Sequence, residues 1–386
     1  MGSISAEAKL PWIETPLISS PELSRAAGCN ILLKLENLQP SGSFKSRGVG
    51  NLVLRAVAAS ASADVHFYCS SGGNAGLACA TSAAALGLAA TIVTPTTTPQ
   101  VMIARLRLLG AHVSQVGASW IEADRHLRAN LLARDPHGVY VPPFDHPDIW
   151  AGAATLVSEL ARQTPPHVDI DAVVASVGGG GLVNGLLQGL EDVERDGAAS
   201  APWPRGRPPT VVAVETRGAD SLHASVEAGR LVTLPAITSI ATSLGAVRVS
   251  ERTWEWARRK AVLGPRRQAE HGGRKMGPAG LESLVVSDAE AAMACVRFAH
   301  DARFVVEVAC GATVAVCYNG ALRERLGRGL SDDEWRGKNV VVVVCGGSNV
   351  SLEVLEEYKA TSARHANSPD LILSSNRSST ISISPK

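Results

Sequence analysis

Short apolar runs alternate with longer segments rich in alanine and leucine along the first part of the chain. Runs with β-branched or aromatic side chains predict strands, and the longer segments with an apolar face predict helices. The predicted strands are residues 31–36, 65–69, 90–94 and 111–116, and the predicted helices are residues 49–59, 77–86, 101–109 and 121–134. This alternation is typical of βαβ units, whose strands form a parallel sheet.

The alternation pauses at a proline-rich stretch, residues 141–147, and then resumes. The later predicted strands are 171–177, 211–215 and 339–344, and the later predicted helices are 153–163, 182–190 and 288–303. The consecutive valines at 340–344 predict a central strand that is buried on both faces. We therefore expect an α/β protein in which the proline-rich stretch crosses between two domains.

Two segments show no apolar period. Residues 258–280 carry many arginines and glycines and are predicted to be an exposed loop, with nucleic-acid binding as a secondary interpretation. Residues 362–386 are rich in serine, asparagine and proline and are predicted to be a disordered tail.

Charge and cysteine content narrow the classes of partner. The formal net charge is +1, which gives no reason to expect nucleic acid or an anionic membrane as a partner. The seven cysteines are an odd number without a Cys-x-x-Cys spacing, which is typical of free thiols in a reducing compartment. No signal peptide or long apolar run is visible, and Ala6 stands where a myristoylation signal needs serine or threonine. By elimination we expect a cytoplasmic protein.

One lysine, Lys45, stands in the octapeptide Ser-Gly-Ser-Phe-Lys-Ser-Arg-Gly, between a predicted strand and a predicted helix. A desolvated lysine has a lowered pKa, and its amine can form a Schiff base with an aldehyde. From the octapeptide alone, a surface lysine at a helix start is an equally good interpretation.

Three glycine-rich loops, residues 70–76, 178–181 and 345–349, each follow a predicted strand. Ligands of open parallel sheets bind beyond the carboxyl ends of the strands, and N–H groups at a helix start bind anions. The four glycines at 178–181 therefore predict a phosphate site, with a tight turn as the alternative. The chain has neither the dinucleotide pattern Gly-x-Gly-x-x-Gly at this loop nor a nucleoside-triphosphate loop. A lysine, a phosphate site and a polar loop together suit pyridoxal phosphate.

Four ordered motifs resemble those of the pyridoxal-phosphate-dependent L-serine/threonine dehydratases. They are Ser-Gly-Ser-Phe-Lys-Ser-Arg-Gly, Ser-Ser-Gly-Gly-Asn-Ala-Gly, Ser-Val-Gly-Gly-Gly-Gly-Leu and Val-Cys-Gly-Gly-Ser-Asn. The resemblance extends over about residues 10–355 and implies the tryptophan-synthase-β-like fold (fold type II). That fold has two open, twisted, mostly parallel sheets with flanking helices. It places the cofactor in the cleft between a large domain (1–39 and 146–361) and a small domain (40–145).

The resemblance also implies a role for each matching residue. Lys45 is the catalytic residue and forms the Schiff base. The residues implied to bind the cofactor are Phe44, Lys45, Asn74 at the ring hydroxyl, Gly178, Gly179, Gly180 and Gly181 at the phosphate, and Cys345 at the pyridine nitrogen. The residues implied to bind the substrate are Ser71, Gly72, Gly73 and Asn74. A monovalent cation, usually K⁺ in this family, is implied at Glu215 and at the carbonyl groups of Gly178, Ala219, Leu244 and Ala246. The alternative for Glu215 is a hydrogen-bonded carboxylate at a sheet end.

The activity that the resemblance implies is β-elimination of water from L-serine or L-threonine, which gives pyruvate or 2-oxobutanoate and ammonia. About forty residues follow Cys345, too few for a regulatory domain, so we expect an unregulated catabolic enzyme, a homodimer by family analogy. Gly72 replaces the serine that acts as a second base in related racemases. Ala151, Ala153 and Val308 depart from the usual dehydratase pattern. The alternatives are therefore another β-eliminase or β-replacement enzyme of the same fold, and a cofactor-binding protein without catalysis.

Overall fold

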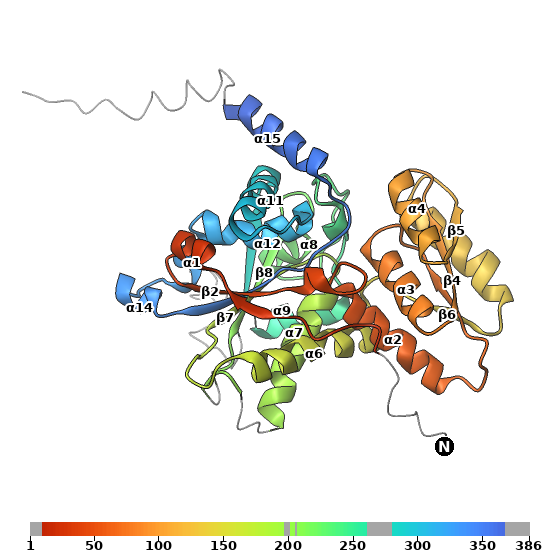
Figure 1. Cartoon of the computed structure of the whole chain (residues 1–386), viewed down its shortest axis with the longest axis horizontal. Helices are drawn as coiled ribbons and strands as arrows, with labels where there is room; N and C mark the ends of the chain where they lie inside the picture. The colour runs from red at the N-terminus through yellow and green to blue at the C-terminus, as the bar shows by residue number, and fades with distance from the viewer. Residues whose placement is uncertain (1–9, 197–200, 205–206, 261–279, 367–386) are drawn as a thin grey trace, which may run out of the picture.

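A computed structural model describes residues 10–196, 201–204, 207–260 and 280–366. The chain forms two lobes, each built around its own sheet (Figure 1). The predicted α/β class with two mostly parallel sheets is confirmed.

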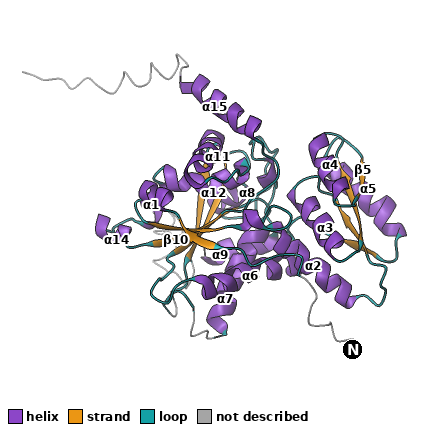
Figure 2. Cartoon of the chain, viewed as in Figure 1, coloured by secondary structure: helices purple, strands orange, loops and turns teal. Residues whose placement is uncertain are grey.

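The large lobe contains a six-stranded sheet with helices on both faces (Figures 1 and 2). Its strands, in spatial order, are β1 (Leu17–Ser19), β2 (Asn30–Lys34), β10 (Asn339–Val343), β7 (Ala172–Ser176), β8 (Thr210–Thr216) and β9 (Leu281–Val286). All neighbours are parallel except β1 and β2. The central valine strand β10 is buried, as its composition predicts. The helices of this lobe are α1 (Pro21–Ala27), α6 (Pro147–Gln163), α7 (Gly181–Arg195), α8 (Ser221–Ala228), α9 (Glu251–Lys260), α11 (Asp288–Ala302), α12 (Val308–Tyr318), α13 (Ala321–Leu326), α14 (Asp332–Arg336) and α15 (Leu352–Ala366).

The small lobe contains a four-stranded sheet in which every neighbouring pair is parallel. Its strands, in spatial order, are β5 (His112–Gln115), β4 (Ala89–Thr94), β3 (His66–Cys69) and β6 (Gly138–Tyr140). The helices are α3 (Asn74–Ala85), α4 (Gln100–Leu108) and α5 (Trp120–His126), and α2 (Lys45–Ala59) runs between the two lobes.

Several predicted boundaries are wrong. Helix α9 continues to Lys260, inside the predicted loop 258–280, because Thr253, Trp256 and Ala257 form a buried stripe at helical spacing. Helix α15 continues to Ala366, inside the predicted tail. The rest of these two segments, 261–279 and 367–386, lies outside the described residues.

The predicted helix 121–134 is divided into three pieces. Helix α5 ends at His126 and is followed by a π-helical turn, Leu127–Leu131, and a 3₁₀ turn, Leu132–Arg134. Short or interrupted elements of this kind have too few residues for a clear hydrophobic period. Within the described ranges, no helix is long and apolar enough to cross a membrane.

Candidate active site

The lysine loop and the 345–349 loop lie side by side although they are far apart in the sequence. The N–H of Phe44 donates to the carbonyl of Cys345 at 3.0 Å, and the N–H of Gly347 donates to the carbonyl of Gly42 at 2.9 Å. Because β2 and β10 are parallel neighbours, the segments that leave their carboxyl ends meet at one sheet edge. This edge holds Lys45, the first residue of α2.

The amine of Lys45 is placed between the two lobes. Its Nζ donates to the carbonyl oxygen of Pro143 at 2.9 Å. The side chain borders a small cavity whose other lining residues include Phe44, Ala153 and Gly181. Burial lowers the pKa of Lys45 to about 8, against the opposing influence of nearby acidic groups such as Glu307. An amine with this pKa has a much larger neutral fraction near physiological pH than an ordinary lysine, and the neutral form can act as a nucleophile and as a base.

The glycine loop 178–181 joins β7 to the start of α7. Gly180 has a φ of 96°, and a Cβ there would lie 1.9 Å from Oγ1 of the buried Thr253. The N–H of Ser250 donates to the carbonyl of Gly179 at 3.0 Å and holds the loop from the other side. The first N–H groups of a helix have no intrahelical partner, so this loop presents donors to an anion.

The 70–76 loop belongs to the small lobe, but Asn74 reaches the large lobe. Its Nδ2 donates to Oε1 of Glu307 at 2.9 Å, and its Oδ1 accepts from the N–H of Ser348 at 3.0 Å. Gly72 lies against Thr98, because a Cβ on Gly72 would be 2.6 Å from the Thr98 methyl group. The Ser71 hydroxyl accepts from the N–H of Gly73 at 3.3 Å.

The Cys345 thiol lies at the end of the central strand and is buried. Its Sγ is 3.4 Å from the hydroxyl oxygen of Ser176. A hydrogen bond with Cys310, together with burial, raises the pKa of the Cys345 thiol well above its usual value. The thiol is therefore neutral near physiological pH.

The residues predicted to hold a cation fall into two groups. Gly178 lies against Leu244, whose Cα would be 3.2 Å from a Cβ on Gly178, and the carbonyl of Leu244 accepts from the N–H of Ala246 at 2.7 Å. Glu215 lies at the end of β8, and Ala219 follows in the next turn, paired with Thr216.

Both carboxylate oxygens of Glu215 accept backbone N–H groups at the start of α8, from Leu222 and His223, each at 2.8 Å. Burial raises the pKa of Glu215 to about 8. The carboxyl therefore occupies the hydrogen-bonded position at a sheet end that we considered as the alternative to a cation ligand.

Two carboxylates at the site were missed by sequence reasoning. Glu307 precedes α12 and contacts Asn74 and the N–H of Asn349, at 3.1 Å. Asp124 in α5 accepts from the hydroxyls of Ser70 and Tyr140, both at 2.7 Å, and so holds the base of the 70–76 loop. Neither stands in a glycine-rich motif, and only their burial or their hydrogen-bond partners reveal them.

The three positions that depart from the dehydratase pattern lie in helices α6 and α12. Ala153 is buried, borders the Lys45 cavity and packs against α7. Val308 is the first residue of α12, next to Glu307. Ala151 lies in the first part of α6.

Comparison with known proteins gives the family. The family described as "Pyridoxal-phosphate dependent enzyme" matches residues 9–346. A protein named "Serine dehydratase-like" from Rattus norvegicus is 44% identical over 347 residues, which cover 89% of this chain and 93% of the relative. The "Catabolic L-serine/threonine dehydratase" of Saccharomyces cerevisiae is 38% identical and is covered to 86%, as is this chain. The chain belongs to the pyridoxal-phosphate-dependent serine/threonine dehydratase family.

A solved structure supports the same family. The fungal L-serine ammonia-lyase from Rhizomucor miehei superimposes with a TM-score of 0.75 at 35% identity, covering 91% of this chain and 99% of that chain. The two-lobed arrangement is therefore the fold of this group of enzymes.

The residues present fit the cofactor that the family uses. No side chain fits at Gly180, because its Cβ would lie 1.9 Å from Oγ1 of Thr253. The first N–H groups of α7 have no intrahelical partner and can bind a phosphate. Lys45 has a pKa lowered to about 8, which suits a covalent bond to an aldehyde.

Proposed function

We propose that this protein is a pyridoxal-phosphate-dependent L-serine dehydratase that also accepts L-threonine. It removes the β-hydroxyl as water, and the enamine that is released takes up one water and loses ammonia. L-Serine thus gives pyruvate and L-threonine gives 2-oxobutanoate. The observation that carries this proposal is the Lys45 amine, with its lowered pKa, beside the glycine loop and the neutral Cys345 thiol. The names of the relatives in the family agree with this activity.

In this proposal each loop has one task. Gly178, Gly179, Gly180 and Gly181 would hold the cofactor phosphate, Asn74 the ring hydroxyl, and Phe44 and Cys345 would contact the ring. When bound, pyridoxal phosphate withdraws electrons from the α-carbon of the substrate and makes the α-proton acidic.

The Lys45 amine then removes the α-proton as general base, because its pKa of about 8 lets it be neutral before the transfer. The Ser71 hydroxyl and the backbone of Gly72 and Gly73 receive the substrate carboxylate. A neutral thiol at Cys345 donates or accepts only weak hydrogen bonds, which limits charge build-up on the ring and favours elimination.

Three finer features belong to the same proposal. A monovalent cation such as K⁺ would bind at the carbonyls of Gly178, Leu244, Ala246 and Ala219, with Glu215 giving up part of its helix-capping role. The protein forms a homodimer in this proposal, which light scattering of the purified protein tests. The cytoplasmic location is tested by cell fractionation.

The deciding experiment is to incubate purified protein, loaded with pyridoxal phosphate, with L-serine, L-threonine and D-serine and to measure keto acid release. We expect release from L-serine and L-threonine, and none with Lys45→Ala. Undiminished release by Lys45→Ala would contradict the mechanism. Activity on none of the three amino acids would favour another β-eliminase or β-replacement enzyme, or a cofactor-binding protein without catalysis.

A further inference from the structure

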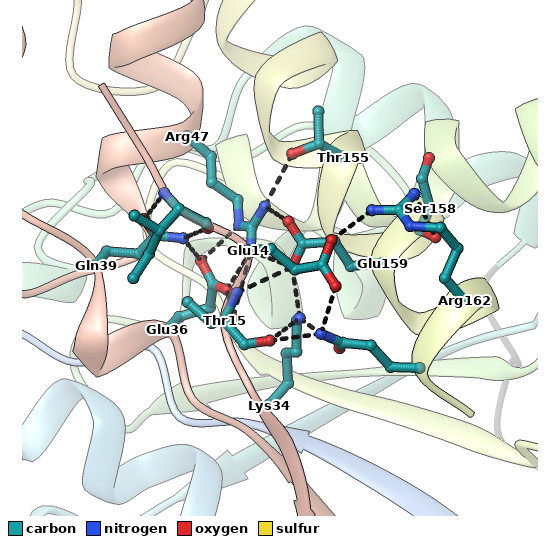
Figure 3. Close-up of polar contacts among 12 residues, drawn as sticks. Glu14, Thr15, Lys34, Glu36, Gln39, Arg47, Thr155, Ser158, Glu159 and Arg162 are labelled. Carbon is teal, nitrogen blue, oxygen red and sulfur yellow. Dashed lines mark hydrogen bonds and ion pairs between the residues drawn. The ribbon is translucent and has the colours of Figure 1, made fainter. Parts of the chain in front are cut away.

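A buried charge cluster lies beneath the first turn of α2 (Figure 3). Its members are Lys34 at the end of β2, Glu36 in the turn that follows, Arg47 in α2 and Glu159 in α6. The side chains of Lys34, Glu36 and Arg47 have no exposed surface, and that of Glu159 is 5% exposed. Two positive and two negative charges compensate each other, so the charge cluster as a whole is neutral.

Arg47 is the centre of the charge cluster. Its Nε and Nη2 donate to the two carboxylate oxygens of Glu36, both at 2.7 Å. Its Nη1 and Nη2 donate to the two oxygens of Glu159, at 2.5 and 2.7 Å. The hydroxyls of Thr155 and Thr15 accept further hydrogen bonds, at 3.0 and 3.3 Å. Bidentate pairs of this kind fix orientation as well as adding energy.

Lys34 holds the carboxylate of Glu159 in place. Its Nζ donates to Oε2 of Glu159 at 2.5 Å, to the carbonyl of Thr15 at 2.6 Å and to Oε1 of Gln163 at 2.8 Å. Burial acts to lower the pKa of Arg47, but the hydrogen bonds that Arg47 donates to Glu36 and Glu159 outweigh it and raise that pKa. Arg47 is therefore charged at any physiological pH.

The backbone of the same turn also lies directly on the large lobe. A Cβ on Gly152 in α6 would be 2.3 Å from the carbonyl oxygen of Arg47, so the two helices touch backbone to backbone. The turn that carries Lys45 therefore contacts the large lobe twice, through its backbone and through the Arg47 side chain.

A buried ion network is an inefficient source of stability, because the desolvation of its charges can exceed their mutual attraction. What such a network provides is a fixed geometry. Arg47 stands only two residues from Lys45 on the first turn of the helix. The turn that carries Glu36 follows β2 and leads into the lysine loop, whereas Glu159 belongs to α6.

We propose that Arg47, held by Glu36 and Glu159, is a positioning residue that fixes the Lys45 amine in the frame of the large lobe. The glycine loop and Cys345 belong to that same lobe, whereas Ser71 and Asn74 belong to the small lobe. A movement between the lobes would therefore change the substrate contacts without moving Lys45 relative to the phosphate loop. The proposal rests on the proposed function of Lys45.

The experiment compares Arg47→Lys and Glu159→Gln with a matched control, Arg55→Gln. Arg47→Lys keeps the positive charge but loses the planar fork. Arg55 also joins α2 to α6, through Asp148 at 3.3 Å, but its side chain is 63% exposed. Each variant is first checked for folding by circular dichroism without cofactor. Pyridoxal phosphate is then added, and the binding rate, the visible circular dichroism of the bound cofactor, kcat and KM are measured.

We expect Arg47→Lys and Glu159→Gln, at temperatures where they are folded, to bind the cofactor more slowly and to show weaker visible circular dichroism. We expect kcat for L-serine to fall by about 10- to 100-fold with little change in KM, the size of effect that a small misplacement of a catalytic group produces. Arg55→Gln should match the unaltered protein. Variants that lose only thermal stability and keep the cofactor signal, the binding rate and kcat would overturn the proposal.

If Glu159→Gln does not fold, the charge-balanced variant Lys34→Met/Glu159→Gln replaces it, since it removes one cation and one anion together. The same criteria apply to it. Failure of this inference is distinguishable from failure of the proposed function. Keto acid release by Lys45→Ala would contradict the proposed function, whereas an inactive Lys45→Ala beside an unaffected Arg47→Lys would contradict only the positioning role.

Discussion

The Nζ of Lys45 donates a 2.9 Å hydrogen bond to the carbonyl oxygen of Pro143. Pro143 lies in the proline-rich stretch between β6 of the small lobe and α6 of the large lobe. The amine is therefore held at the crossing between the lobes, on a half-buried side chain. Its reactivity depends on pH in a predictable direction.

The rate at which the cofactor-free protein binds pyridoxal phosphate should rise with pH. The neutral amine is the nucleophile, and the pKa of Lys45 is lowered by burial to about 8, so the protonated form dominates below that pH and the neutral form above it. Stopped-flow absorption measurements across the neutral and alkaline range should give a midpoint near 8. Lys45→Ala is the control and should show no covalent attachment after borohydride reduction. A midpoint near 10.5, the ordinary value for lysine, would contradict the prediction.

Gly180→Ala should weaken cofactor binding far more than Gly110→Ala. Both glycines have left-handed backbone, with φ of 96° and 81°, so each alanine costs about 1 kcal/mol of backbone strain. Only the Cβ at 180 meets another group, Thr253, whereas nothing lies within 4 Å of a Cβ at 110. Denaturant unfolding and titration with pyridoxal phosphate measure the two effects. Equal cofactor affinities in the two variants would be evidence against a phosphate site at this loop.

Asp124→Asn should raise KM for L-serine more than it lowers kcat. Asp124 accepts hydrogen bonds from Ser70 and Tyr140 at 2.7 Å and from Nε of Arg128 at 2.8 Å, and asparagine cannot accept all three. We expect KM to rise by about tenfold, which corresponds to the loss of about one hydrogen bond to a charged group.

The matched control for Asp124→Asn is Asp135→Asn. Asp135 accepts from the hydroxyl of Tyr68 at 2.8 Å, and Tyr68 lies in β3, the strand before the 70–76 loop. Steady-state kinetics of both variants tests the role of Asp124. A similar KM change in both variants would mean that the effect spreads through the whole small lobe.

The stability of the cofactor-free protein should fall as the pH rises from about 5 to 8, in part because of Glu215. Burial raises the pKa of its carboxyl from 4.5 to about 8, so the folded state binds this proton more tightly than the unfolded state. The resulting stabilisation is complete below pH 4.5 and is lost as the pH rises through 8.

Glu215→Gln should flatten this slope, because an amide does not titrate. It should also lower the free energy of unfolding by about 1–3 kcal/mol, since the amide nitrogen cannot accept the second N–H at the start of α8. Urea unfolding at several pH values, with and without K⁺, measures both effects. The same slope in the two proteins would show that other groups cause the pH dependence.

Much of the fold could be predicted from the sequence. Short runs of residues with a strong β preference, such as the valines of β10, form buried strands where neighbouring strands can pair with them. Some of the missed elements are short, such as β1 and β6, or follow a π-helical turn, as after α5. Two longer helices, α12 and α15, were missed as well. Their residues are ordered by packing against the rest of the lobe, which a local pattern does not contain.

Only part of the candidate site could likewise be predicted from the sequence. Lys45 and the glycine loop could be proposed from the sequence, because phosphate binding and covalent attachment need those residue types in loops. Glu307 and Asp124 were not, since a carboxylate gains its role from the partners that the fold brings to it, Asn74 for one and Ser70 for the other.

The sequence by itself indicated the family, the α/β alternation and the candidate lysine, because each follows from contiguous residues and their spacing. The tertiary structure decided how that lysine is held. Pro143, Cys345 and Glu159 come from segments that are remote from Lys45 in the chain. Cys345 meets the lysine loop because the parallel strands β2 and β10 end at the same edge of the large sheet. Pro143 is brought in by the stretch between the lobes, and Glu159 by helix α6. The pKa of Lys45 is likewise a property of this assembled environment, since burial lowers it and no neighbour in the sequence does.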